Sequence, residues 1–328
     1  MGKRKRDSPP GDIRMEQRLA AGDQPLTEQQ KALTRRAYSL FREFVNELRE
    51  AHDEMREARE MRQLSQRERS VTAPPSNALN SCIDNVIADQ IDNMPEALML
   101  PEREATANSA DEMSDVVSFV LYQSAWPDVY QIIMEDAAVT GTGIAQVFWD
   151  DDADDGNGMV SVQAWHPEDF YPDPTQENIQ DGRACFKVTH TSVAWVEEHY
   201  PHARGYVHGD HAEDADAHQQ PVELEDLTAV DDHIKTTLIE FWYRRYDAQT
   251  RRNRVHMAQL AGGALLYSTE LAYGGAKEND YPDGVYAHGE YPFVLYKYRT
   301  VWRKPFGTGL VFACAQMPAF RLGVELCE

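Results

Sequence analysis

Apolar residues recur at spacings of three and four over much of the first 140 residues, which is the periodicity of amphipathic helices. The first run follows the capping-box pattern Thr27-Glu-Gln-Gln30 and predicts one long helix that ends near Leu64. Shorter runs predict a helix over 78–91, one that starts at the second capping box Ser109-Ala-Asp-Glu112, and one that opens at Pro127. The chain therefore begins with a series of helices.

The pattern changes from helical to strand-like at Gly141-Thr-Gly143. Two apolar runs at 144–149 and 159–165 flank an acidic, glycine-containing turn at 150–158, which predicts a β-hairpin. Prolines 167, 172 and 174 predict an irregular, extended segment. Later runs predict a short helix at 192–199 and strands at 184–189, 236–246, 255–260, 264–268 and 291–298. Helices first and strands afterwards indicate an α+β fold.

Composition separates further parts of the chain. The polar, basic start has too little apolar surface to order itself, and the segment before residue 234 is strongly acidic. We therefore expect six segments: a disordered basic tail (1–25), a helical part (26–140), a β-hairpin and proline-rich part (141–202), an acidic flexible insertion (203–233), a β-rich part (234–300) and a C-terminal segment (301–328).

The net charge of −23 argues against tight binding of nucleic acid, because affinity for a phosphate backbone comes largely from lysine and arginine. Such a protein can still surround DNA without gripping it. Aromatic residues of the predicted strands, Trp149 and Trp242 among them, could stack on single-stranded bases. The lack of basic residues around them favours ordinary packing of sheet faces instead.

No apolar run approaches the roughly 18 residues that a membrane span needs, and no apolar stretch follows the basic start as in a signal peptide. We expect a cytoplasmic protein without a membrane partner. The four cysteines lie far apart with no C-x-x-C pair, which predicts free thiols rather than a disulfide framework or a zinc ribbon. They are Cys82, Cys185, Cys314 and Cys327.

Two loops superficially resemble ligand-binding motifs, one for phosphate and one for calcium, but lack the residue pattern that each motif requires. Gly141-x-Gly143 has neither the third glycine of a dinucleotide fingerprint nor a following Gly-Lys-Ser/Thr, so a turn from helix to strand explains it better. The acidic turn from Asp150 to Asp155 fails the register of a calcium loop, because Ala153 and Val162 occupy ligand positions. A hydrated hairpin turn is the simpler interpretation.

The histidine cluster is the place to look for a divalent metal. It comprises His199, His202, His208, His211 and His218, with Glu197 and Glu198 before it. Pro201 interrupts the helix that an H-E-x-x-H site needs. Neither a G-x-S-x-G elbow nor a nucleophilic cysteine context is present. We therefore assign no catalytic residue, no metal ligand and no cofactor, and expect that the protein is not an enzyme.

Several motifs, taken in order, resemble a known family. The runs 140–150, 158–162 and 166–174, followed by 239–244, 291–294 and 306–310, resemble the wing region of podovirus-type portal proteins of tailed bacteriophages, the head-to-tail connectors. The resemblance covers roughly residues 27 to 316. It implies structural roles for Gly141, Gly143, Trp149, Asp150, Pro167, Asp169, Phe170, Tyr171, Asp173, Pro174, Glu240, Trp242, Pro292, Gly307 and Gly309.

The resemblance also implies a function in the virion. In that family many copies, typically twelve, form a closed homo-oligomeric ring at one capsid vertex, which requires heterologous interfaces. The large subunit of terminase docks on the ring during packaging, a tail or neck adaptor attaches afterwards, and capsid or scaffolding proteins surround it. Double-stranded DNA passes through without sequence-specific contacts. Assembly would take place in the cytoplasm of the bacterial host.

One departure from the family lies at the C-terminal segment. Portal chains of this type continue after the glycine-rich run 306–310 into a stem helix, a clip, a second stem helix and a crown. The sequence reaches only Glu328, and Pro318 breaks the helix expected there, so 301–328 looks like an aborted start of the stem. We expect stem, clip and crown to be missing, as in a portal gene truncated by a frameshift or prophage decay, and the chain 1–328 by itself to be monomeric or weakly associated.

Two other functions stay open from the sequence. A capsid-associated adaptor or scaffold-like protein would bind virion proteins without enclosing DNA. A metal-dependent hydrolase would use the histidines from His199 to His218 with acidic residues. It would bind a stoichiometric metal ion and would lose activity when His199 or His202 is changed.

Overall fold

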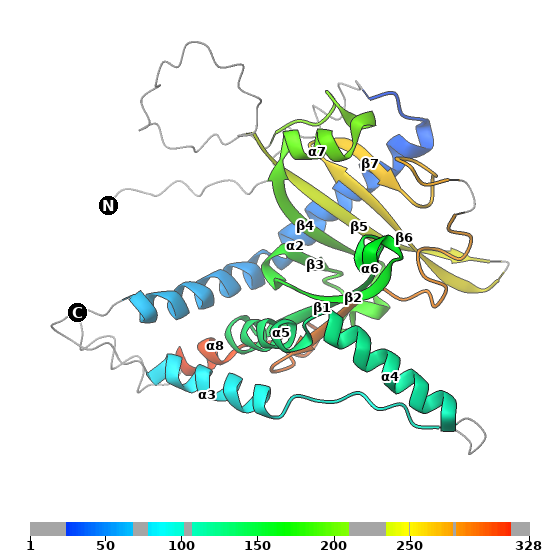
Figure 1. The fold of residues 1–328 in the computed structure, drawn as a ribbon. Helices are drawn as coiled ribbons and strands as arrows, with labels where there is room; N and C mark the ends of the chain where they lie inside the picture. Colours follow the sequence, from blue (N-terminus) through cyan, green and yellow to red (C-terminus); the bar gives the residue numbers. More distant parts are fainter. Residues whose placement is uncertain are drawn as a thin grey trace, which may run out of the picture. The chain divides into compact units, whose positions relative to one another are not determined.

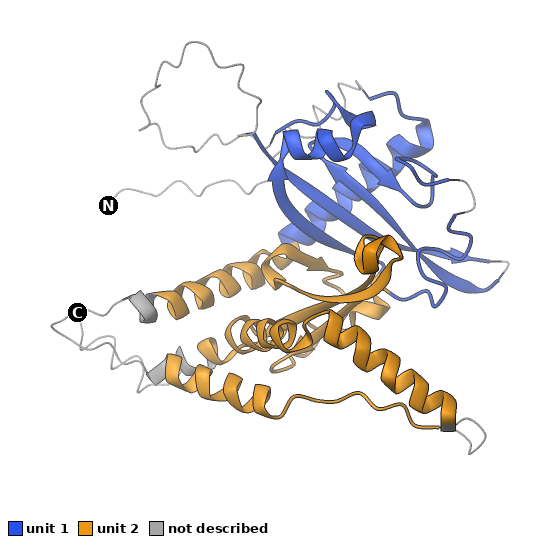
Figure 2. Ribbon diagram, in the orientation of Figure 1, with its two compact units in different colours: residues 1–46, 183–290 blue, residues 47–182, 291–328 orange. Residues whose placement is uncertain are grey.

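The computed structural model describes residues 24–67, 78–101, 107–209, 234–248, 250–277 and 280–315. Nearly all of the expected basic tail, the part of the acidic insertion from 210 to 233, and the chain after 315 with Pro318 lie outside these residues. The chain forms two compact units (Figure 2). Unit 1 combines residues 1–46 with 183–290, and unit 2 combines 47–182 with 291–328. Each unit therefore joins segments that are far apart in the sequence.

Among the described residues, four helices precede the first strand, as the sequence predicts (Figure 1). Helix α2 (Glu28–Arg67) opens with the expected capping box: the Thr27 amide donates to Oε1 of Gln30 at 2.9 Å, and the Gln30 amide donates to Oγ1 of Thr27 at 3.3 Å. The helices that follow are α3 (Ala78–Asp92), α4 (Ala107–Gln123) and α5 (Trp126–Thr140). The start expected at Ser109 is wrong, because α4 already includes Ala107, a strong helix former.

The predicted hairpin forms two strands of a three-stranded antiparallel sheet in unit 2, with its first strand in the centre. Strand β1 (Thr142–Asp150) pairs with β2 (Met159–Trp165), with Val147 opposite Val162. Strand β8 (Phe293–Lys297) pairs with the other edge of β1, which gives the order β2-β1-β8. The turn between β1 and β2 contains the short segment α6 (Ala153–Gly156), in which Asp154 and Asp155 have left-handed φ values of 53° and 55°.

Helix α5 covers one face of this sheet. Its side chains Tyr130, Ile133 and Met134 pack with Ala145 of β1 and Ala164 of β2. The close approach needs a glycine in β1, because a Cβ at Gly143 would lie 2.2 Å from the carbonyl oxygen of Ile133.

The rest of unit 2 consists of short elements. They are the 3-10 turns η2 (Pro167–Asp169) and η3 (Ile179–Asp181), strand β3 (Phe170–Pro172) and helix α8 (Leu310–Ala315). The proline-rich segment is extended and irregular, as expected. Phe170 packs on Phe293 with ring centroids 4.8 Å apart. A buried cluster of Ile83, Val139 and Val311 joins α3, α5 and α8.

Unit 1 contains an antiparallel meander. Its strands are β4 (Ala184–Ser192), β5 (Lys235–Asp247), β6 (Arg252–Ala261) and β7 (Ala264–Ser268), hydrogen-bonded in that order. Ser192 caps helix α7 (Val193–His199) by accepting a hydrogen bond from the Trp195 amide at 3.2 Å, and the turn η4 (Pro201–Ala203) follows. The expected short helix at 192–199 and the expected strands at 184–189, 236–246, 255–260 and 264–268 are confirmed.

The first part of α2 packs on the β4–β7 sheet within unit 1. Phe41 and Phe44 meet the ring of Phe186 edge-on, at centroid distances of 5.2 and 5.4 Å. Helices followed by antiparallel sheets confirm the α+β class. In the described part of the chain, no helix combines the length and the apolar character needed to cross a membrane.

Candidate functional site

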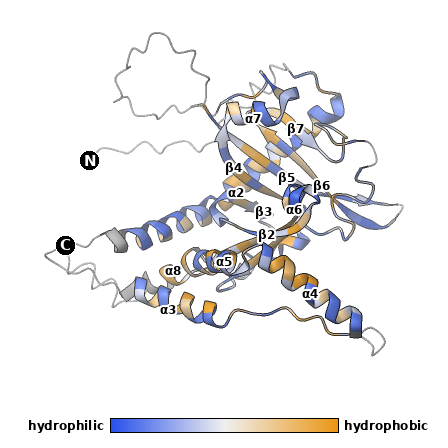
Figure 3. Ribbon diagram, viewed as in Figure 1, coloured by the Kyte–Doolittle hydropathy of each residue, from blue (hydrophilic) through white to orange (hydrophobic). Residues whose placement is uncertain are grey.

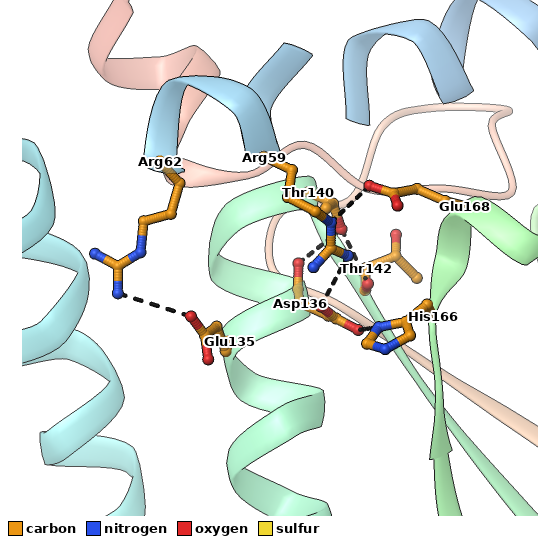
Figure 4. Close-up of polar contacts among 8 residues, drawn as sticks. All are labelled: Arg59, Arg62, Glu135, Asp136, Thr140, Thr142, His166 and Glu168. Carbon is orange, nitrogen blue, oxygen red and sulfur yellow. Dashed lines mark hydrogen bonds and ion pairs between the residues drawn. The ribbon is translucent and has the colours of Figure 1, made fainter. Parts of the chain in front are cut away.

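A polar network in unit 2 holds α2, α5 and the segment after β2 together (Figure 4). Arg59 of α2 donates from Nε to Oε1 of Glu168 at 2.7 Å and from Nη2 to Oδ1 of Asp136 at 3.1 Å. The side chain of Asp136 is only 4% exposed. Burial alone would lower the pKa of Arg59, but the two carboxylates outweigh it, so the pKa is raised.

The second oxygen of Asp136 faces an imidazole. Nδ1 of His166 lies 2.8 Å from Oδ2 of Asp136, and this hydrogen bond, partly opposed by burial, raises the pKa of His166. The Thr140 hydroxyl donates to the backbone carbonyl of Asp136 at 2.7 Å. Thr140 is therefore not presented to His166 as a nucleophile, and the arrangement orders the helix end rather than forming a catalytic triad.

A second arginine links three helices. Arg62 donates from Nη1 to Oδ1 of Asn80 at 2.8 Å and from Nη2 to Oδ1 of Asp84 at 2.5 Å. Its Nη2 also lies 3.7 Å from Oε1 of Glu135. A planar guanidinium suits such a role, because its five donors have fixed directions.

Three of the expected glycines meet where α5 gives way to β1. Gly141 has φ 100° and donates its amide to the carbonyl of Ala137. A Cβ at Gly141 would lie 2.4 Å from the carbonyl oxygen of Gly307, and one at Gly309 would lie 2.3 Å from that of Val139. The Gly307 amide donates to Oγ1 of Thr142 at 2.9 Å. Neighbouring backbone thus fills the space that a phosphate loop would leave for its ligand.

Most of the expected proline-rich positions lie near β3 and β8. Nε2 of His52 lies 3.2 Å from the Phe170 carbonyl oxygen, and its ring meets Tyr171 edge-on at 4.4 Å. Burial lowers the pKa of His52 to about 4 and raises that of Tyr171. The carboxylate of Asp173 accepts from the amide and hydroxyl of Thr175 at 3.1 and 2.7 Å. Three further positions, Pro167, Asp169 and Pro174, belong to the same segment.

The remaining expected positions lie in other parts of the fold. Pro292 accepts a hydrogen bond from the Val147 amide at 2.9 Å. Trp149 is exposed and donates from Nε1 to Oδ1 of Asp151, while Oδ1 of Asp150 accepts from the Asp152 amide. Glu240 and Trp242 lie in β5 of unit 1, where Glu240 pairs with Lys187 at 3.4 Å and Trp242 stacks with Tyr286. Of the fifteen positions, thirteen therefore belong to unit 2 and two to unit 1.

The histidine cluster forms no metal centre among the described residues. Nδ1 of His199 lies 2.9 Å from the Trp195 carbonyl oxygen, and Nε2 of His202 lies 2.8 Å from that of Leu266. Throughout the described ranges, no three side chains of histidine, cysteine, aspartate or glutamate come close enough to hold a metal ion. His211 and His218 lie outside those ranges. The described part of the chain therefore contains no metal site for the alternative hydrolase.

The buried polar residues of α2 were not predicted from the sequence as functional or structural positions. His52, Arg59 and Arg62 continue the three- and four-residue spacing of Leu48 and Met55 along α2. Polar residues on the apolar stripe of a helix are a signal for buried, paired side chains, because an unpaired charge there is costly.

Comparison with protein families identifies the family of this chain. A family model described as phage P22-like portal protein matches residues 34–284, which is more than half of the chain and includes residues of both units. Among curated proteins, no sequence matches this chain.

Proposed function

The chain belongs to the phage P22-like portal protein family, and from that premise we propose that its copies form the closed ring at one capsid vertex through which double-stranded DNA is packaged and ejected. The observation that carries the proposal is the match over 34–284, which takes in helices α3, α4 and α5 of unit 2 and the meander of unit 1. Both units are then parts of the portal wing, and the segments from 26 to 300 contribute to it.

The ring would have partners on both sides of the capsid wall. As in the family, we propose about a dozen copies per ring, docking of the terminase large subunit during packaging, and later attachment of a tail or neck adaptor. Capsid or scaffolding proteins would surround the ring during assembly in the host cytoplasm. No membrane has a part in this function.

The charge of the chain supports passage of DNA without tight binding. The chain contains 55 acidic and 32 basic residues, which gives a net charge of −23. A wall of that sign repels phosphates, so DNA can slide past without the counterion release that drives tight binding.

We propose no catalytic activity and no cofactor for the chain. Arg59 and Arg62 bind carboxylates from neighbouring elements, and these contacts hold the helices together. The expected family positions would likewise serve folding, as the packing around Gly141, Gly307 and Gly309 supports.

Labelling of phage particles tests the proposal. Antibodies against the chain, applied to particles of a phage that encodes it, should mark a single vertex of each capsid, and quantitative mass spectrometry should give about a dozen copies per particle. Label spread over the shell would contradict the proposal and favour a capsid adaptor. Label in immature particles alone would favour a scaffold-like protein.

A further inference from the structure

Helix α4 leaves its apolar side uncovered. Every described side chain from 108 to 123 is exposed or half-buried. Phe119 is 54% exposed and Tyr122 81% exposed, and Met113 and Val116 are exposed on the same helix. Figure 3 shows hydrophobic positions recurring along α4. Contiguous apolar surface of this kind on a soluble protein marks an interaction site.

The segments next to α4 add further exposed apolar residues, and hydrogen bonds hold the helix in place. Leu98 and Leu100 are exposed in the connection that precedes the helix, and the Met99 amide between them donates to Oγ of Ser114 at 2.9 Å. Just after the helix, Ser124 Oγ accepts from the Val162 amide of β2 at 3.0 Å. The helix is therefore attached to the sheet while its apolar residues stay accessible.

The charges of α4 are all of one sign. Its sequence contains Asp111, Glu112 and Asp115, each exposed, and neither lysine nor arginine. We call the exposed residues Met113, Val116, Phe119 and Tyr122, together with these three acids, the α4 surface. A partner for this surface should offer a large apolar side chain next to positive charge.

A turn elsewhere in unit 2 presents that combination. The Lys304 amide donates to the Val301 carbonyl at 3.1 Å, which closes a tight turn with Trp302 and Arg303 at its tip. Trp302 is 78% exposed, and the Arg303 guanidinium lies 4.6 Å over its ring. We call residues 299–304 the Trp302 turn.

The Trp302 turn is held in shape by its own contacts. Lys297 donates from Nζ to the carbonyls of Lys304 and Glu177 at 3.1 and 2.7 Å, and the Thr308 amide donates to the Arg299 carbonyl at 2.9 Å. Arg303 has φ 58°, a left-handed conformation that costs a non-glycine residue free energy. A surface tryptophan fixed in this way loses little further entropy on binding.

The turn is basic in an otherwise acidic protein. Arg299, Arg303 and Lys304 are exposed and 299–304 contains no acid. Tryptophan and arginine are the residue types most enriched at the energetic centres of interfaces. The turn and the α4 surface thus match in apolar character and are opposite in charge.

Resting on the proposed function, we propose that the Trp302 turn of one copy docks on the α4 surface of the neighbouring copy in the portal ring. A closed ring requires two different surfaces on each subunit, one for each neighbour, and these two surfaces come from different elements of unit 2. Trp302 would pack against Phe119 and Tyr122, while Arg299 and Arg303 face the acids of α4.

DNA is the other partner that a basic turn fits. The exposed indole favours the second copy, because an uncovered apolar side chain gains most from apolar contact, and α4 supplies it. The same experiment distinguishes the two partners.

Isotope-mixed photocrosslinking tests the inference. The full chain is made with p-benzoylphenylalanine in place of Trp302, in light and nitrogen-15 forms, mixed at high concentration with and without double-stranded DNA, and irradiated. Mass spectrometry should find light-to-heavy crosslinks from position 302 to residues 107–123. Crosslinks within single chains, to other residues, or to DNA would overturn the inference, as would their absence between copies.

Reversing the charges on the two surfaces distinguishes the loss of an interface contact from a folding defect. The pair Glu112→Lys and Asp115→Lys, or the pair Arg299→Glu and Arg303→Glu, should each lower the intermolecular crosslink yield about tenfold, and all four changes together should restore most of it. The matched control pair Glu57→Lys and Glu60→Lys, on exposed positions of α2, should leave the yield unchanged. Equal losses in the control would overturn the assignment.

Different results would contradict the docking of the Trp302 turn on the α4 surface and the proposed portal function. If particles carry the chain at a single vertex but crosslinks lead away from α4, the surface assignment falls and the portal function stands. If antibody label covers the shell, the function falls whatever the crosslinks show.

Discussion

Nδ1 of His166 lies 2.8 Å from Oδ2 of Asp136, whose side chain is 4% exposed and whose other oxygen accepts from Arg59. The hydrogen bond to Asp136 raises the pKa of His166 above its ordinary 6.5, although burial opposes it. The folded protein therefore holds a proton at this residue more tightly than the unfolded chain does, which links proton binding to stability.

Stability should fall as the pH rises above neutrality because of this residue. A raised pKa in the folded state gives a stabilisation that is complete below 6.5 and is lost as the pH passes the raised value. The effect should be modest, since the His166 side chain is 57% exposed. Urea unfolding of the parent and of His166→Asn between about pH 6 and 9 should show a decline that the variant lacks. Parallel profiles would refute the linkage.

His52 should act in the opposite direction. Its burial lowers the pKa to about 4, so the unfolded chain binds the proton more tightly and stability is lost as the pH falls from 6.5 towards 4. The full difference is on the order of 3 kcal/mol, at about 1.4 kcal/mol per unit. In thermal unfolding, the stability of the His52→Leu variant should change less with pH over this range than that of the parent. An unchanged slope of stability against pH would show that His52 does not titrate in this way.

Removing Arg59 should destabilise unit 2 strongly. Arg59→Met leaves the buried Asp136 without its cation, and breaking one partner of a buried pair costs about 3 kcal/mol. The further change Asp136→Asn should recover part of the loss, because the uncompensated charge is gone. Chemical denaturation measures both variants.

An exposed arginine three residues earlier on α2 is the matched control for Arg59. Arg56 pairs with Asp53 at 3.2 Å, with both side chains more than half exposed. Arg56→Met should change the free energy of unfolding by less than about 1 kcal/mol. If Arg56→Met and Arg59→Met cost the same, the buried network does not stabilise unit 2 as argued.

Gly141→Ala should cost much more than Gly156→Ala. Both glycines have left-handed φ values, 100° and 88°, but a Cβ at Gly141 would lie 2.4 Å from the Gly307 carbonyl oxygen, whereas nothing lies within 4 Å of one at Gly156. We expect about 1 kcal/mol of backbone strain at Gly156 and about 3 kcal/mol at Gly141, where overpacking adds to it. Similar melting temperatures for the two variants would contradict the close approach.

Local signals in the sequence were sufficient for much of the fold. The capping box at Thr27 and the cap at Ser192 depend on residues within three positions, so sequence spacing predicts them well. The second capping box failed because α4 already includes Ala107 and Asn108, which places Ser109 inside the helix. Pairing of β8 with β1 joins Gly143 to Tyr296, and no local pattern indicates such a partner.

The polar network escaped prediction for the same reason. Arg59 lies on the apolar stripe of α2, which is a signal for burial, but its partners are 77 and 109 positions away and no local pattern identifies them. The family positions were found through their order along the chain, yet their roles depend on contacts such as that of Gly141 with Gly307, which only the folded chain displays.

The most direct test of the portal function is an asymmetric cryo-electron microscopy reconstruction of a DNA-filled particle of a phage that encodes this chain. The account predicts a ring at one vertex whose subunits contain the β2-β1-β8 sheet and the β4–β7 meander, with DNA density along the ring axis. Density for these sheets outside the vertex ring, or at a position that DNA never crosses, would contradict it.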